Sequence, residues 1–255
     1  MARGGRAKQA PLPPPLPPET RTVGQVVAET INLYRRRFWP SLALGLGPAA
    51  ATVGVTLIGG WWALVFVLTA FSLLMTASYV GAVAIASEKR ADRKSLLVAI
   101  AVGYVVFLPA PFLYGLFVLP AVIWLALVGL SVPAAFIERL GYRGAIRRGL
   151  ELARADYIHA AGSLATLVIV AFLTSTVLFF LLRGASQVER SAAAFLSLLV
   201  ISPILFLGAA LLYYDQAARV RTRRSDADVR DAYDPDRPRR ADAEGEPRPA
   251  ARGES

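Results

Sequence analysis

Apolar residues occur in four long uncharged stretches, and arginine-rich polar segments lie between them. The stretches run from Pro40 to Ser87, from Ser95 to Ile137, from about 158 to 182 and from about 191 to 214. A transmembrane helix needs about 20 apolar residues, so each of the first two stretches is long enough for two helices. The pattern therefore predicts an all-α fold, a six-helix integral membrane bundle over residues 40–215.

Breaks inside the two longest stretches set the span boundaries. Gly59-Gly60 is a helix-breaking pair, which divides the first stretch into spans 41–58 and 61–86. The second stretch turns either in Pro109-Ala110-Pro111 or near Leu119-Pro120, because proline interrupts a helix. We favour the turn near Leu119-Pro120, since it leaves both halves closer to spanning length.

Two shorter segments have the spacing of amphipathic helices. Residues 21–39 begin with a capping-box signature at Thr22 and Gln25, continue with apolar residues at helical intervals and end in Arg35, Arg36 and Arg37. Residues 142–157, approximately, show a similar apolar face beside Arg147 and Arg148. Basic amphipathic helices of this kind lie at the headgroup boundary of a membrane, so we expect two juxtamembrane helices.

The two ends of the chain have compositions typical of disorder. Residues 1–20 are basic and then proline-rich, which favours an extended tether over packed structure. Residues 216–255 are rich in Asp, Arg, Pro and Ala, which predicts a disordered charged tail. The predicted organisation is therefore one membrane domain between two disordered termini.

The segments that join the spans are alternately rich and poor in basic residues. Nearly all Lys and Arg lie near the N-terminus, after span two, after span four or in the C-terminal tail, and only Arg183 and Arg190 lie between spans five and six. Cytoplasmic segments carry such an excess, so both termini should be cytoplasmic. A hydrophobic content of 55% and a mean hydropathy of +0.49 also exceed those of soluble chains. The net charge of +10 collects beside the membrane, which favours anionic lipid over nucleic acid as partner.

The predicted spans contain no Asp, Glu, Lys or Arg. Ion-coupled and proton-coupled transporters place such groups inside the membrane, so the sequence disfavours both classes. The chain has no Cys and one His, His159, and no serine has an evident base beside it, so we expect no catalysis, no metal and no cofactor. One face of span two carries the hydroxyls of Thr69, Ser72, Thr76 and Tyr79. They either line a polar path or, as we favour, form interhelical hydrogen bonds.

Several short motifs resemble one known membrane family. The opening, Val23 to Val26 and Leu33 to Trp39, is similar to that of the membrane domain associated with glycerophosphoryl diester phosphodiesterases, found in many actinobacterial membrane proteins. Later landmarks match in order over about residues 22–219: Pro133 with Glu138, Ala145 to Leu152 with Arg148, and Leu212-Tyr213-Tyr214-Asp215. The chain departs from the family at Gly149, often Ser, and at Ala217, often Arg.

The resemblance implies a multi-helix membrane domain without the phosphodiesterase itself. That catalytic domain is a soluble barrel of roughly 200 residues or more with several acidic and histidine ligands. His159 alone cannot supply them.

Our leading hypothesis is a non-enzymatic, multi-pass protein of the bacterial plasma membrane that organises lipids or partner proteins at the inner leaflet. The expected partners are anionic inner-leaflet lipids, with a membrane or cytoplasmic protein as a further possibility and no nucleic acid. The candidate contacts are Arg35, Arg36, Arg37, Arg147, Arg148 and Asp215. The alternative is a transporter or transporter subunit for a lipid-like or hydrophobic substrate, and a lipid-cleaving enzyme that depends on His159 ranks third.

Overall fold

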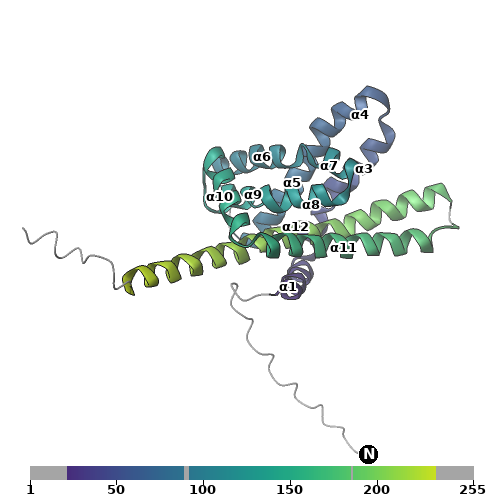
Figure 1. Cartoon of the computed structure of the whole chain (residues 1–255). Coiled ribbons are helices and arrows are strands. Elements are labelled where there is room, and N and C mark those ends of the chain that lie inside the picture. Colours follow the sequence, from purple (N-terminus) through teal and green to yellow (C-terminus); the bar gives the residue numbers. More distant parts are fainter. Residues whose placement is uncertain (1–21, 89–91, 185, 234–255) are drawn as a thin grey trace, which may run out of the picture.

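The computed structural model describes residues 22–88, 92–184 and 186–233, and all regular elements within these ranges are helices (Figure 1). Six helical stretches among the described residues are long and apolar enough to cross a membrane. They run over Phe38–Leu57, Gly60–Ser87, Arg93–Leu116, Val118–Ile137, Tyr157–Leu178 and Val188–Ala227. The predicted all-α bundle is confirmed, and the chain is a multi-pass membrane protein.

The first four spans each consist of more than one helix. Span one contains α2 (Phe38–Leu44) and α3 (Leu46–Leu57), and span two contains α4 (Gly60–Phe66), the π-helical η2 (Val67–Phe71) and α5 (Ser72–Ser87). Span three contains α6 (Arg93–Phe107) and α7 (Ala110–Leu116), span four contains α8 (Val118–Val128) and α9 (Ser131–Ile137), and spans five and six are α11 (Tyr157–Leu181) and α12 (Gln187–Tyr233). Two more helices are α1 (Val23–Arg36) and α10 (Tyr142–Ala155). Figure 1 shows α10 at one end of the bundle and the turn between α11 and α12 at the other.

The turns inside the two longest apolar stretches lie close to their predicted positions. The first is at Gly59-Gly60, where Gly60 has a φ of +61°, a conformation that glycine adopts without strain. The second is at Phe117, whose backbone is extended, two residues before Leu119. Pro109 instead separates α6 from α7 within span three, because proline cannot donate the next helical hydrogen bond.

Helix α1 lies across α11 and α12 and buries its apolar face against them (Figure 1). The backbone nitrogen of Thr22 donates to Gln25 Oε1 at 2.8 Å, so the predicted capping contact forms. Val26, Thr30 and Tyr34, spaced four residues apart, are the buried residues of this helix. An amphipathic helix therefore forms within residues 21–39, with protein covering its apolar side, and its position at the headgroup boundary stays a prediction.

The core lies where α5, α6, α9 and α12 meet. The rings of Tyr79, Phe107 and Phe206 pack there with centroids 5.9 to 6.2 Å apart. Three of the four hydroxyls on the polar face of span two, those of Thr69, Ser72 and Thr76, donate to carbonyls of their own span and not across the interface, as in the 2.7 Å bond from Thr76 Oγ1 to Ser72 O. The predicted interhelical hydrogen bonds are therefore wrong, because the carbonyl one turn earlier is the nearer acceptor.

The C-terminal part of α12 corrects the prediction of a disordered tail. Helix α12 continues to Tyr233, so residues 216–233 are helical. Ala217 and Val220 in this extension are buried against Leu152 and Ala153 of α10, which supplies the apolar surface that the tail's own composition lacks. Residues 1–20 and 234–255, also predicted to be disordered, lie outside the described residues.

Candidate functional site

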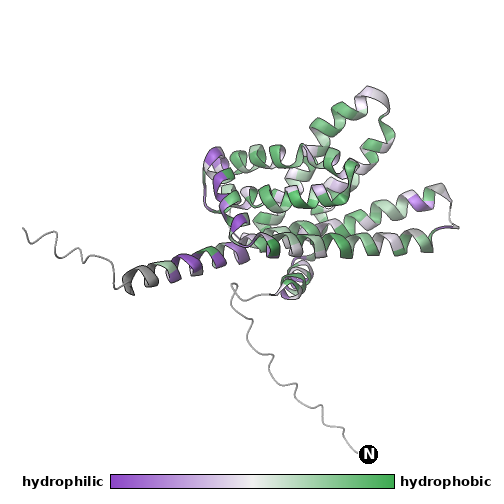
Figure 2. Ribbon diagram, in the orientation of Figure 1, coloured by the Kyte–Doolittle hydropathy of each residue, from purple (hydrophilic) through white to green (hydrophobic). Residues whose placement is uncertain are grey.

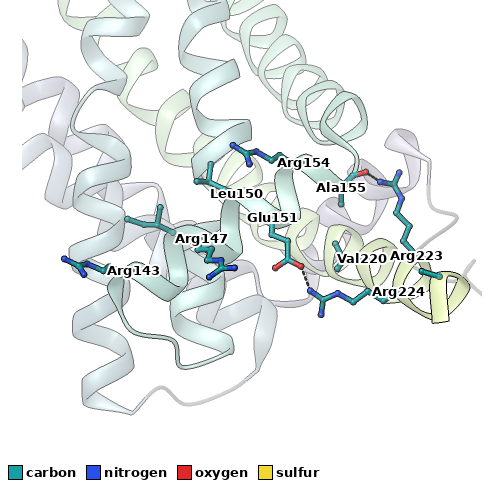
Figure 3. A pocket seen from close by; sticks show the side chains of 11 residues that line it. Arg143, Arg147, Leu150, Glu151, Arg154, Ala155, Val220, Arg223 and Arg224 are labelled. Atoms are coloured by element: carbon teal, nitrogen blue, oxygen red, sulfur yellow. Dashed lines mark hydrogen bonds and ion pairs between the residues drawn. The ribbon is translucent and has the colours of Figure 1, made fainter. Parts of the chain in front are cut away.

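A groove of about 890 Å³ lies between α10 and the C-terminal part of α12 (Figure 3). Arg143, Arg147 and Arg154 line it from α10, and their spacing of four and seven residues places them on one face of that helix. Arg223 and Arg224 line it from α12, and the groove also has apolar wall residues and one carboxylate, Glu151. Figure 2 shows that hydrophilic residues gather at this end of the molecule, whereas the spanning helices are mostly hydrophobic.

Three of the five arginines have, among the described residues, no protein contact that would compete with a ligand. Arg224 donates to the carboxylate of Glu151, and Arg223 donates to the backbone oxygen of Ala155 (Figure 3). The side chains of the other three are exposed and form no ion pair or hydrogen bond with any residue in the described ranges; they are Arg143, Arg147 and Arg154. Guanidinium groups in this state bind phosphate or carboxylate oxygens, so the groove is a candidate anion site.

Glu151 holds α10 against α12. Its carboxylate pairs with Arg148 of its own helix at 3.0 Å and with Arg224 of α12. Partial burial alone would raise the pKa of this carboxyl, but hydrogen bonds and Coulombic attraction from the two arginines outweigh burial and lower the pKa below its ordinary value. Glu151 is therefore ionised at neutral pH and fixes the position of Arg224 at the groove.

Arg148, a predicted contact, points into the protein and not into the groove. Its Nε lies 3.0 Å from Glu138 Oε1, and its side chain is only 17% exposed. The hydroxyl of Tyr213 donates to the same Glu138 oxygen at 2.6 Å. Burial would lower the guanidinium pKa of Arg148, but Glu138 and Glu151 more than offset this and raise it. Arg148 therefore ties α10 to the end of α9 and to α12, while its neighbour Arg147 faces the groove.

Asp215, another predicted contact, is fully buried where α11 and α12 meet. Its Oδ2 lies 2.8 Å from His159 Nε2 and 3.2 Å from Arg219 Nε. Arg219 also pairs with Asp156 at 2.9 Å, and Asp156 caps α11 by accepting the backbone N–H of His159. Asp215 presents no surface to an external lipid or protein, so its predicted role as a contact is corrected to an internal one.

The polar residues of this buried cluster link two helices. Ser163 lies one helical turn after His159, and its buried hydroxyl forms no hydrogen bond with the residues that the structure describes. Asp215 Oδ1 and Gln216 Oε1 are likewise buried without a protein partner in the described ranges. The ion pairs of the cluster join Asp215 and Arg219 of α12 to His159 and Asp156 at the start of α11 and so hold the two helices together.

The remaining predicted contacts, Arg35, Arg36 and Arg37, lie at the C-terminal end of α1. All three are exposed, and none lines the groove. Arg37 pairs with Glu88 at the end of α5 at 3.2 Å, but both side chains are more than half exposed, so solvent screens this pair. They form a second basic surface, separate from the groove.

The sequence analysis missed Arg143, Arg154, Arg223 and Arg224. The regular spacing of Arg143, Arg147 and Arg154 was a signal for the first two. Arg223 and Arg224 gave no such signal, because they reach the groove through the packing of Ala217 and Val220 against α10, a contact between segments far apart in the chain.

A second hollow lies inside the membrane-spanning part of the bundle. This cavity has a volume of about 550 Å³, and residues from all six spans line it. No Asp, Glu, Lys, Arg or His is among the lining residues. It is therefore suited to an uncharged, apolar occupant.

No family model, curated protein or solved structure matches this chain. The resemblance to the membrane domain associated with glycerophosphoryl diester phosphodiesterases thus stays a prediction.

Proposed function

We propose that this chain is a non-enzymatic protein of the bacterial plasma membrane that organises anionic lipids at the inner leaflet. The groove between α10 and α12 is the proposed contact for the phosphate of the lipid headgroup. The observation that carries this proposal is the set of exposed arginines without ion pairs on one face of α10, namely Arg143, Arg147 and Arg154.

The orientation of the bundle supports this placement. The groove and the exposed arginines of α1 lie outside the apolar stretches, whereas the loop between spans five and six contributes only Arg183 and Arg190. Cytoplasmic segments carry the excess of basic residues, so we assign the α10 end to the cytoplasm, together with both termini. The bacterial plasma membrane and membership of the actinobacterial-type family are proposals that rest on the sequence resemblance.

Lipid binding by the purified full-length chain tests the proposal. After delipidation, phosphatidylglycerol is added, and retained lipid is measured by native mass spectrometry against the triple variant Arg143→Gln, Arg147→Gln and Arg154→Gln. Each basic residue near an anionic surface contributes on the order of 1 kcal/mol, so the triple variant should bind phosphatidylglycerol roughly 100-fold more weakly.

The control removes two arginines from the opposite end of the molecule, Arg183→Gln with Arg190→Gln, and should leave binding unchanged. Glycerol phosphate added as a competitor distinguishes the phosphate group from the lipid as the recognised species. Equal retention of phosphatidylglycerol by the triple variant and the unmodified protein would contradict the proposed site. A stoichiometric protein that co-purifies in mild detergent and depends on the same arginines would replace lipid with a protein partner.

A transporter of hydrophobic substrates is the second candidate, and the apolar cavity favours it. Its walls come from every span, and no intramembrane charge would oppose passage of an uncharged molecule. Flux of such a molecule in liposomes that contain only this protein tests the idea. Flux no faster than in empty vesicles would leave the lipid-organising role as the better account.

A further inference from the structure

The helix interruptions of this protein converge on the apolar cavity. In five of the six spans, a proline, a π-helical turn or a break between helices lies among or beside the lining residues. They are Pro48 in α3, η2 with Val67 and Phe71, the Pro109 to Pro111 segment between α6 and α7, Gly129-Leu130 between α8 and α9, and Pro203 next to Ser202 in α12. Irregular backbone at membrane depth is tolerated where it lines a cavity and not where it faces lipid.

Side chains from neighbouring spans secure these interruptions. The hydroxyl of Tyr104 in α6 donates to the carbonyl oxygen of Leu68 in η2 at 2.7 Å. The indole Nε1 of Trp124 in α8 donates to the carbonyl oxygen of Val106, in the last turn of α6, at 2.8 Å. Each bond satisfies a carbonyl near a point where regular helix ends, so the walls are held in a defined shape. The cavity is therefore preformed.

The apolar cavity is partly open to the outside of the bundle, so its volume of about 550 Å³ can admit part of a molecule from the surroundings. Water gains little in such a space, because it needs two or more polar partners there. The surrounding membrane supplies hydrocarbon chains at high concentration, so an alkyl chain is the natural occupant.

One buried polar group in the wall defines the ligand further, whereas Tyr114, also in the lining, is 63% exposed. Tyr79 lines the cavity and is 3% exposed, and its hydroxyl forms no hydrogen bond with any residue in the described ranges. The hydroxyls of Thr52 and Ser202, which also line the cavity, donate to carbonyls of their own helices. A hydroxyl that faces an apolar cavity has few acceptors within reach, and an ester or hydroxyl oxygen on the ligand would supply one.

We propose that the cavity is a binding site for one uncharged single-chain lipid, with its alkyl chain among the apolar walls and an oxygen atom at the Tyr79 hydroxyl. The absence of charge from the lining excludes a strong contact with a phosphate or free carboxylate at this depth. The site does not depend on the basic groove, so either proposal can fail without the other.

Photolabelling of the full-length protein in lipid nanodiscs tests the site. The probe is a monoacylglycerol with a diazirine in its acyl chain, and the labelled positions are mapped by mass spectrometry. We expect label on lining residues of several spans, such as Met75, Leu125 and Phe206, and displacement of that label by unlabelled monooleoylglycerol. Label confined to the outward-facing residues of the spans, or not displaced by competitor, would overturn the proposal.

Two variants separate the cavity from the outer surface. Ala209→Phe places a ring inside the cavity and should reduce labelling of the lining residues at least fivefold, and Ala121→Phe, from α8, should do the same. Ala50→Phe, on an exposed face of α3, is the matched control and should leave labelling unchanged. Undiminished labelling in a folded Ala209→Phe or Ala121→Phe protein would refute the site.

Tyr79→Phe removes only the hydroxyl and tests the polar contact. Monooleoylglycerol should then compete several-fold less well, whereas competition by an alkane of equal length should not change. Unchanged competition by monooleoylglycerol, or an equal loss for both competitors, would mean that the hydroxyl makes no specific contact with the ligand and would overturn the oxygen contact.

Discussion

Asp215 illustrates how the fold changes the role of a single residue. It follows two tyrosines at the end of an apolar stretch, a position that in sequence suggests a headgroup anchor. In the structure it is instead fully buried and shared between His159 and Arg219. A buried carboxylate is stable only when opposite charges and hydrogen bonds replace water, and these partners do so.

Replacing Asp215 by Asn should therefore destabilise the protein. The substitution preserves shape but leaves Arg219 and His159 without their shared carboxylate, and removing one partner of a buried pair costs about 3 kcal/mol or more. Equilibrium unfolding in mixed micelles would measure the loss. Asp226→Asn, at an exposed position on α12, is the control and should change stability by less than about 0.5 kcal/mol. Equal stability of the two variants would show that the buried cluster contributes nothing.

The contact between α9 and α10 depends on a glycine. A β-carbon on Gly149 would lie 2.5 Å from the backbone nitrogen of Ser131 and 2.7 Å from its Cα. Any side chain here would force the two helices apart, so the absence of a β-carbon at Gly149 is what permits their close approach.

Gly149→Ala should lower the free energy of unfolding by about 1 to 3 kcal/mol, because backbone must move to admit the methyl group. Gly144→Ala in the same helix is the matched control, since its β-carbon would meet only Leu140 at 3.6 Å. Alanine is the better helix former by about 1 kcal/mol, so this control should be neutral or stabilising. A similar gain from both substitutions would disprove the close approach. Urea unfolding in micelles measures both.

At the scale of the whole molecule, charge is distributed unevenly between the two ends of the bundle. The α10 end holds the groove and the partly buried ion pairs of Arg148, while the other end is mainly apolar (Figure 2). This asymmetry is the basis for assigning the α10 end to the cytoplasm.

Single-cysteine labelling checks that assignment, because the chain has no Cys of its own. In intact cells, a membrane-impermeant maleimide should modify Gly184→Cys, at the turn before α12, and should leave Gly144→Cys on α10 unmodified. After permeabilisation both should react, since both positions are exposed. The reverse pattern would place the groove outside the cell and exclude an inner-leaflet role.

Local composition was sufficient to predict much of the fold. The spacing of uncharged stretches gave six spans, Gly59-Gly60 and the prolines placed the turns to within a few residues, and Thr22 with Gln25 marked the start of α1. Each of these features is set by residues that lie close together in the chain. A span needs enough apolar residues to cross the membrane, and proline lacks the N–H that a helix requires, so the sequence alone predicts both.

Contacts between distant segments decided the rest. Ala217 and Val220 are buried against α10, Arg148 is withdrawn from the surface by Glu138, and Asp215 is paired with a histidine 56 positions earlier in the chain. Prolines or helix breaks from five spans lie among or beside the residues that line the cavity. The sequence by itself determined which segments enter the membrane, since burial in lipid is a property of each segment. Only the tertiary structure decided which charges remain available, because pairing requires two partners whose positions the bundle sets.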